Sequence, residues 1–402
     1  MAPRQPTILQ IIPRLDTGGA ELATVEITAA LMSAGARALV ASEGGRMAHQ
    51  VTAAGGELVD FPAASKNPAQ LIANAVRLAR LIGRESVDLV HARSRAPAWS
   101  ALIAARCTHR PFVTTYHGAY AERGSAKRLY NSVMARGDVV IANSRYTADL
   151  ISARYGTDPA RIAVIPRGVD LERFAPDRIE PARVASLRHR WAVAETQPVI
   201  LQAARLTRWK GQEVLIAAVA ELRRQGRLGE AVAILAGDAQ GRDDYAGALA
   251  RQAAALGVAD RVRLVGHVED IAAAYAAAHV TVVASSEPEA FGRAAAEALA
   301  MGCPVIGTRL GALPESVRAE PDAAPGEITG WLVPPGDSKA LALCLHAALS
   351  LSPAARAAMA VRARADALSR FAVSAMQRQT LAVYDRLLGT HLAEQGSSSQ
   401  GA

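Results

Sequence analysis

The sequence predicts an α/β protein of two Rossmann-like domains that face each other across a cleft. Short apolar segments of strand length alternate with helix-like segments along most of the 402 residues, which is typical of parallel sheets with helices on both faces. The alternation breaks once, at residues 166–190, where three prolines and many charges occur without a strand. A break of this composition indicates a connection between two domains.

The N-terminal domain is expected over residues 1–170. The turn from its first strand to its first helix contains Gly18 and Gly19, and glycines at such a turn let the backbone approach a phosphate. Their spacing is not that of a dinucleotide-binding loop, and no Walker lysine follows. The first helix is expected at residues 20–33, and the strands at residues 7–13, 38–42, 58–61, 89–92, 112–116 and 139–142.

The C-terminal domain is expected over residues 193–370, after a linker at residues 171–192. A last helix is expected at residues 374–388, and the end of the chain, residues 393–402, is expected to be disordered because it is rich in Gly and Ser. The strands expected in this domain are residues 199–203, 231–236, 262–265, 280–284, 305–308 and 330–333.

The net charge of +8 is concentrated in the N-terminal part, where residues 1–180 hold 22 Lys and Arg against 16 Asp and Glu. Aromatic residues are only 4% and no basic stripe carries them, which argues against nucleic acid as a partner. An anionic lipid or saccharide fits this charge distribution better as a partner. Residues 66–84 read as a basic amphipathic helix that contacts a membrane, or as a core helix with a solvated face. Its apolar face would be Leu71, Ala75, Leu78 and Ile82, and its basic face Arg77, Arg80 and Arg84.

The three cysteines, Cys107, Cys303 and Cys344, lie far apart, so neither a disulfide framework nor a zinc site is indicated. No apolar run reaches the roughly 18 residues that span a bilayer, and no signal segment is apparent. A cytoplasmic location is therefore expected, and the basic N-terminal domain leaves open a contact with the inner face of the cell membrane.

Two carboxylates, Glu289 and Glu297, flank the start of an expected helix at residues 292–301. The unpaired N–H groups at a helix start carry the positive end of the helix dipole, which suits a diphosphate. Carboxylates suit sugar hydroxyls, because each accepts hydrogen bonds from neighbouring OH groups. The alternative is that Glu297 is an exposed helix residue and Glu289 an acid favoured by the dipole.

Two cations, Arg205 and Lys210, follow the strand at residues 199–203. They would lie at the carboxyl end of the sheet, where they could neutralise a leaving diphosphate, or they are solvated loop residues. His117 and the run at residues 91–95 also follow strand ends, where open sheets bind ligands. No D-x-D run suits a metal that bridges phosphates, so no metal and no cofactor are expected.

These motifs together resemble the family 4 (group 1) retaining glycosyltransferases, which have the GT-B fold. The resemblance covers residues 7–390. It rests on GGAE at 18–21, TYHG at 115–118, ANS at 142–144, IPRGVD at 165–170, RLTRWKG at 205–211, AGD at 236–238, EAFGRAAAEALAMGCPVIGT at 289–308, GALPE at 311–315 and GWLVPPGD at 330–337.

The resemblance implies that the C-terminal domain binds the donor and the N-terminal domain the acceptor, with the helix at residues 371–390 packing back onto the N-terminal domain. The implied catalytic residues are His117, Arg205, Lys210 and Glu289. The implied donor-binding residues are Gly18, Gly19, Arg205, Lys210, Glu289, Ala290, Phe291, Gly292, Arg293 and Glu297.

Within this set, the resemblance implies that Glu289 contacts the donor sugar, Glu297 the ribose, and Arg205 and Lys210 the diphosphate. His117 would lie near the reacting centre. Two positions depart from the family pattern: Ala290 stands where Gly or Ser is usual, and Arg167 stands where Asn is common.

The implied function is retaining transfer of a hexose from a UDP- or GDP-sugar to a saccharide or lipid-linked acceptor, in the synthesis of cell-envelope lipopolysaccharide or polysaccharide. A sugar-nucleotide 2-epimerase of the same fold and a non-catalytic sugar-nucleotide-binding protein are the alternatives. A nicotinamide-dependent dehydrogenase would share the sheet, but the glycine fingerprint is missing.

Overall fold

The computed structural model describes residues 5–16, 18–65, 67–118, 120, 124–239, 241 and 243–398. The chain divides into two compact units, which are described separately. Unit 1 is Met1–Gly168 together with Val373–Ala402, and unit 2 is Val169–Ala372.

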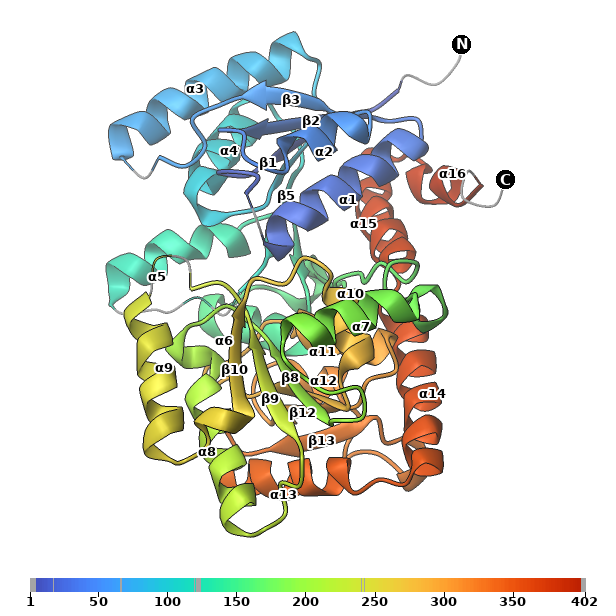
Figure 1. The fold of residues 1–402 in the computed structure, drawn as a ribbon. Helices are drawn as coiled ribbons and strands as arrows, with labels where there is room; N and C mark the ends of the chain where they lie inside the picture. The colour runs from blue at the N-terminus through green and yellow to red at the C-terminus, as the bar shows by residue number, and fades with distance from the viewer. Residues whose placement is uncertain are drawn as a thin grey trace. The chain divides into compact units, whose positions relative to one another are not determined.

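Unit 1 is built on a sheet of seven parallel strands in the order β3-β2-β1-β4-β5-β6-β7 (Figure 1). Its five central strands are buried along almost their whole length, as expected of a parallel sheet that is covered on both sides, whereas the edge strands β3 and β7 are partly exposed. Their bounds are β1 (Thr7–Ile11), β2 (Arg37–Ser42), β3 (Glu57–Asp60), β4 (Leu89–Ala92), β5 (Phe112–Tyr116), β6 (Val139–Ala142) and β7 (Ile162–Val164).

Helices cover both faces of this sheet, and successive strand residues serve different cores. Leu9 packs into a cluster with α3, α4 and α6, whereas its neighbour Ile8 packs into a cluster with α1, α15 and α16. The helices of unit 1 are α1 (Gly19–Ser33), α2 (Ala48–Ala53), α3 (Pro68–Arg84), α4 (Arg95–Cys107), α5 (Ser125–Ser132), α6 (Arg145–Tyr155), α15 (Val373–Leu388) and α16 (Leu392–Ser398).

Unit 2 contains a second parallel sheet, of six strands in the order β10-β9-β8-β11-β12-β13. Its strands are β8 (Val199–Ala203), β9 (Val232–Ala236), β10 (Val262–Gly266), β11 (Val280–Val283), β12 (Val305–Thr308) and β13 (Gly330–Val333). Its helices are α7 (Pro181–Arg190), α8 (Gln212–Arg224), α9 (Asp243–Ala255), α10 (Ile271–Ala277), α11 (Arg293–Ala300), α12 (Leu313–Ser316), α13 (Ser338–Leu349) and α14 (Pro353–Arg370).

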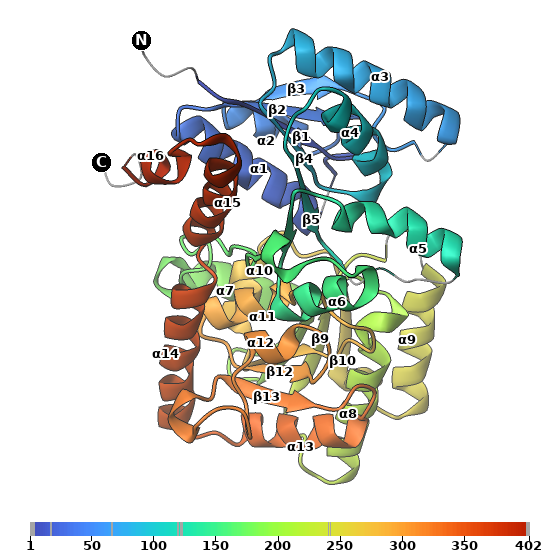
Figure 2. The same cartoon turned by 180° about the vertical axis from the view of Figure 1, so that it is seen from behind.

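The two faces of the second sheet also have separate cores. Helices α7, α10, α11 and α14 pack on one face, and α8, α9 and α13 on the other (Figure 2). Two parallel sheets with helices on both faces confirm the predicted α/β class. The predicted return of the last helix is also found, because α15 belongs to unit 1, where it packs on α1.

The structure differs from the predicted linker at residues 171–192. This segment contains α7, and it contributes Phe174, Leu187 and Trp191 to the core of unit 2. Pro181 occupies the first turn of α7, where a missing N–H costs no hydrogen bond. Pro176 and Pro181, two of the three prolines that indicated a linker, therefore start helical turns within unit 2.

The predicted disorder of residues 393–402 is wrong for the part that the structure describes. Residues 392–398 form α16, whose first residue Leu392 is 2% exposed. Asp385 of α15 accepts hydrogen bonds from the backbone N–H groups of Leu392 and Ala393, at 2.7 and 2.9 Å. This capping, together with burial of Leu392, orders a segment whose composition predicts disorder; residues 399–402 lie outside the described residues.

Strand β7 has only three residues and was not predicted, whereas the other strands begin and end within two residues of their predicted bounds. In the described part of the chain no single helix is long and apolar enough to cross a membrane. One bent pair, Ser338–Leu349 with Pro353–Arg370, meets the length and composition criteria together, with an angle of 108° between its helices.

Candidate functional site

Two loops of unit 2 bring Lys210 and Glu289 together. Lys210 ends a short 3-10 turn after β8, and Glu289 lies between β11 and α11. The Lys210 ammonium and the Ser285 hydroxyl both donate to Glu289 Oε1, the latter at 2.6 Å. The Lys210 and Glu289 side chains are 18% and 11% exposed, so water screens this ion pair only weakly. Glu289 Oε2 has no donor among the described residues, which leaves it able to accept from a ligand.

Backbone contacts join these two loops. The Ser286 N–H donates to the Trp209 carbonyl at 2.7 Å. Gly211, directly after Lys210, has φ of 71°, and a Cβ there would lie 1.9 Å from the Ala284 carbonyl oxygen. Only glycine permits this close approach, so the RLTRWKG motif ends on Gly211 for a steric reason.

The backbone of Glu289 is supported from behind by Gly311. The two residues form an isolated parallel bridge, and the Ala312 N–H donates to the Glu289 carbonyl at 2.9 Å. A Cβ at Gly311 would lie 2.5 Å from that carbonyl oxygen. The GALPE motif therefore determines the position of the Glu289 loop.

Helix α11 begins after Gly292, which has φ of 80°, and a Cβ there would lie 2.6 Å from Leu313 Cδ2. Inside α11, Arg293 Nε donates to Glu297 Oε1 at 2.6 Å, and the Tyr275 hydroxyl donates to Glu297 Oε2 at 3.3 Å. Burial, and next the charge of Glu297, raise the pKa of Tyr275 well above its usual value, so Tyr275 stays a donor. Glu297 is thus held by two protein groups, Arg293 and Tyr275.

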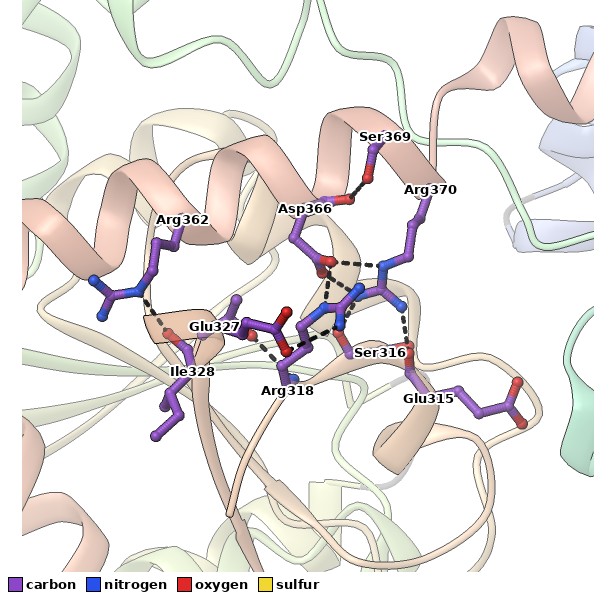
Figure 3. A network of polar contacts seen from close by, with 10 residues as sticks. Glu315, Ser316, Arg318, Glu327, Ile328, Arg362, Asp366, Ser369 and Arg370 are labelled. Carbon is purple, nitrogen blue, oxygen red and sulfur yellow. Dashed lines mark hydrogen bonds and ion pairs between the residues drawn. The ribbon is translucent and has the colours of Figure 1, made fainter. Parts of the chain in front are cut away.

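A polar network holds the segment that supports Glu289 and Gly292 (Figure 3). Arg370 of α14 donates to the carbonyls of Glu315 and Ser316, at 2.5 and 3.0 Å. Asp366, one turn earlier on α14, pairs with Arg370 and accepts from Arg318 Nε at 2.6 Å. Helix α14 thereby fixes the segment after Gly311.

The remaining predicted residues of unit 2 differ in what they offer a ligand. The Phe291 side chain is 5% exposed and packs edge-on against Phe371, so only its backbone could reach a donor. Arg205 is exposed, and its side chain has no polar partner within the described ranges. Ala290 contributes no functional group beyond its backbone.

In unit 1, the predicted residues His117 and Gly19 meet at Arg167. Arg167 Nη2 lies 2.8 Å from His117 Nδ1. A Cβ at Gly19 would lie 1.8 Å from Arg167 Nη1, so the glycine makes room for the guanidinium. Gly18 precedes α1, and its carbonyl accepts from the Leu22 N–H at 3.1 Å.

The Arg167 contact determines the tautomer of His117. A guanidinium only donates hydrogen bonds, so Nδ1 of His117 must accept, and the neutral ring carries its proton on Nε2. Burial, and next the charges of Arg167 and Arg93, hold the pKa of His117 well below its usual value. Nε2 is buried and has no partner among the described residues. An unpaired buried donor of this kind suits a ligand oxygen.

Comparison with family models decides the family. Residues 17–173 match the model described as Glycosyltransferase Family 4, and residues 185–366 match that of Glycosyl transferases group 1. The chain is a family 4, group 1 glycosyltransferase.

Individual relatives agree with this assignment. The glycosyltransferase is 33% identical to a D-inositol 3-phosphate glycosyltransferase of Kineococcus radiotolerans, over 77% of this chain and 74% of the relative. It is 33% identical to a GDP-mannose-dependent alpha-(1-6)-phosphatidylinositol monomannoside mannosyltransferase of Mycolicibacterium smegmatis, over 60% of this chain and 64% of the relative.

A solved structure supports the same fold. The structure of Alr3699/HepE from Anabaena in complex with UDP-glucose has a TM-score of 0.81 at 27% identity, and covers 95% of this chain and 100% of that chain. The predicted family and the GT-B fold class are thereby confirmed for this glycosyltransferase.

In the glycosyltransferase, the run at residues 91–95, which was expected at a ligand-binding strand end, has a structural role instead. His91 is fully buried in β4, where its Nδ1 contacts the Tyr384 hydroxyl at 2.6 Å and its Nε2 the Thr115 hydroxyl at 2.7 Å. Arg93 is 3% exposed and donates to Gln10 Oε1 at 3.0 and 2.5 Å. The polar atoms of His91 therefore hold α15, and those of Arg93 hold β1. Both side chains are buried because this end of the sheet is covered.

Sequence reasoning missed Ser285 and Arg167 as contributors to the site. Ser285 follows β11 directly, and its position four residues before Glu289 is the only signal that could have indicated the contact. Arg167 was noted as a departure from the family, but a contact with a residue 50 positions away leaves no local pattern. The described residues of the glycosyltransferase contain no group of three His, Cys, Asp or Glu side chains placed to hold a metal ion.

Proposed function

We propose that the protein is a retaining hexosyltransferase whose unit 2 binds a UDP- or GDP-hexose. The observation that carries this proposal is the geometry of Glu289. Its Oε1 is held by Lys210 and Ser285, while Oε2 has no donor in the described part of the chain. A carboxylate fixed at one oxygen presents the other in a defined direction, which suits two adjacent sugar hydroxyls.

The start of α11 and the two cations are proposed to bind the diphosphate. As the acceptor hydroxyl oxygen forms its bond to the anomeric carbon, the bond to the diphosphate breaks and negative charge grows on the leaving oxygen, which takes up the proton of the acceptor hydroxyl. Arg205, Lys210 and the positive end of the α11 dipole would stabilise that charge. Glu297 would accept from the ribose with the lone pairs that Arg293 and Tyr275 leave free.

Unit 1 is proposed to bind the acceptor, with His117 donating from Nε2 to an oxygen of the reacting sugar. The turn at Gly18 and Gly19 would contact the donor phosphate. The relatives' names support a phosphorylated or lipid-linked acceptor, since one acts on D-inositol 3-phosphate and the other on a phosphatidylinositol mannoside. Cell-envelope lipopolysaccharide or polysaccharide synthesis remains the proposed setting.

A peripheral membrane contact through α3 is also proposed. Ala75, Leu78 and Ile82 are buried, as the core-helix alternative requires, but Ile72 and Val76 are 65% and 47% exposed. Exposed apolar groups beside exposed arginines suit the interface of an anionic bilayer.

Incubation with a panel of UDP- and GDP-hexoses tests the proposed reaction. An inositol phosphate and a lipid-linked saccharide serve as acceptors. We expect nucleoside diphosphate release that depends on the acceptor, and a product whose anomeric configuration, read by NMR, equals that of the donor. Appearance of an epimerised sugar without acceptor would instead identify a 2-epimerase. Donor binding without any release would identify a non-catalytic binding protein.

Thermal shifts against the same panel identify the donor independently of turnover. A donor at about 100 times its dissociation constant should stabilise the fold by about 2.7 kcal/mol. No stabilisation by any sugar nucleotide would contradict the proposed donor site.

A further inference from the structure

Unit 1 contains a cavity of about 720 Å³ that is lined by residues of α4, α5 and the end of α6. Its lining includes no Asp or Glu among the described residues but has five arginines. We call this cavity the arginine pocket, after Arg106, Arg128, Arg136, Arg154 and Arg161.

Among the described residues, carboxylates neutralise only a small part of the positive charge in the arginine pocket. Only Arg106, of the five, faces a carboxylate within the described ranges: it pairs with Asp138 at 3.1 and 2.7 Å. Arg128 donates to the backbone carbonyl of Arg154, and Arg154 donates to that of Tyr120 at 2.7 Å. Carbonyl oxygens orient a guanidinium but leave its charge in place.

The other two arginines, Arg161 and Arg136, are likewise held by uncharged groups. Arg161 donates to the backbone carbonyl of Gly137. Arg136 lies over the Trp99 ring, with 5.2 Å between the guanidinium carbon and the ring centroid, and it donates to the Ser132 hydroxyl at 3.2 Å. Each guanidinium has five N–H groups, so several donors per arginine remain for a ligand in a pocket where the side chains are already oriented.

The arginine pocket lies away from the residues proposed for sugar transfer. Arg136 precedes β6 and Arg161 directly precedes β7, so both mark the amino ends of these strands. His117 and Arg167 follow the carboxyl ends of β5 and β7. Because the strands are parallel, the two sets lie at opposite edges of the sheet.

We propose that the arginine pocket is a second binding site, specific for a phosphate ester. Several guanidinium groups around one cavity match a phosphate, because its charged oxygens accept bidentate hydrogen bonds in pairs. The cavity is large enough for a small ligand. A soluble phosphorylated metabolite and an anionic lipid headgroup share this chemistry. The inference does not depend on the proposed donor specificity or on α3.

Binding of two probes distinguishes the two sources. The soluble probe is glycerol 3-phosphate, followed by calorimetry, and the membrane probe is phosphatidylcholine vesicles with and without phosphatidylglycerol, followed by sedimentation. The pocket variant is Arg128→Gln with Arg136→Gln. The control variant is Arg227→Gln with Arg251→Gln, which removes the same charge from exposed positions of unit 2.

We expect the wild type to bind at least one probe, and the pocket variant to bind it about tenfold more weakly while the control variant stays within about twofold. Binding of glycerol 3-phosphate identifies a soluble ligand, and binding of anionic vesicles alone identifies a headgroup. Failure of both probes to bind the wild type, or equal losses in the two variants, would overturn the proposal.

Two further variants separate loss of probe binding from misfolding and from loss of transferase activity. Arg128→Lys with Arg136→Lys retains the charge but loses the planar fork, so we expect intermediate binding. Glu289→Gln should bind the probes as the wild type does, because Glu289 belongs to unit 2. Full loss of probe binding in Glu289→Gln would place the binding at the donor site and also overturn the proposal.

Discussion

At the scale of single residues, the contact between Arg167 and His117 has the clearest chemical consequence. It leaves the His117 proton on Nε2, and the charge of Arg167 is, after burial, the largest cause of the lowered pKa. A neutral imidazole with one fixed donor is suited to hold a sugar oxygen without carrying a charge of its own.

Replacement of Arg167 by Met should raise the pKa of His117 and let the ring sample both tautomers. The pKa should remain below its usual value of about 6.5, because burial persists. Ring ¹⁵N NMR across a pH titration measures both effects, and Arg128→Met serves as a control for loss of an arginine elsewhere in unit 1. Unchanged ring shifts in Arg167→Met would show that Arg167 does not set the tautomer.

At the scale of elements, helix α14 supports the loop that carries Glu289. Asp366 is central to this support because its side chain is 8% exposed and binds both Arg318 and Arg370. Loss of its charge would leave two guanidinium groups without their carboxylate, and Arg370 also holds the carbonyls of Glu315 and Ser316.

We expect Asp366→Asn to lower the free energy of unfolding by about 1 to 3 kcal/mol. The matched control is Asp322→Asn, since Asp322 is 64% exposed and pairs only with the exposed Arg309 in the described structure. Loss of the Asp322 charge should lower the free energy of unfolding by no more than about 1 kcal/mol. Denaturant unfolding measures both, and similar losses in the two variants would argue against the supporting role of α14.

The elements of both sheets were predictable because buried parallel strands are continuous apolar runs with glycine and proline at their ends. The failures have physical causes. Strand β7 is too short for a periodic pattern, and Phe174, Leu187 and Trp191 bury a segment whose prolines and charges indicate a linker. The order of α16 depends on Asp385, a tertiary contact that composition does not report.

The candidate site was predictable only in part. The motifs place Glu289, Lys210 and His117 at strand and helix ends, but they do not indicate which of these residues contact each other. Lys210 and Glu289 are 79 positions apart, and their contact depends on how β8 and β11 adjoin in the sheet. His91 illustrates the opposite failure. It lies where ligand binding was predicted, but both of its ring nitrogens are hydrogen-bonded within the protein, to Tyr384 and Thr115.

At the scale of the whole molecule, buried neutral histidines make stability depend on pH. Burial is the main cause that lowers the pKa of His91 and His117 well below the usual value, and that of His279 to about 4. Arg93 and Arg167 add to this effect in unit 1, and Arg356 and Arg188 in unit 2.

The unfolded chain binds protons at these histidines below about pH 6.5, whereas the folded chain does not, so stability should fall as the pH falls. His91 and His117 each contribute a loss of about 1.4 kcal/mol per pH unit below that value, and the half-buried His279 contributes less. Urea unfolding at about pH 7.5 and about pH 5 measures the difference. A constant free energy of unfolding over this range would contradict the burial of these rings, because the carboxylates titrate mainly at lower pH.

Glu289, held by Lys210 and Ser285, is proposed to bind the donor sugar during transfer. Steady-state kinetics of Glu289→Gln against Glu287→Gln tests this proposal most directly, since Glu287 is exposed and only two residues away. With a donor and acceptor that the wild type uses, and with folding verified by thermal unfolding, we expect Glu289→Gln to lower kcat about a hundredfold or more. Glu287→Gln should remain within about twofold of the wild type. Wild-type turnover by Glu289→Gln would show that the Glu289 carboxylate is not needed for sugar transfer.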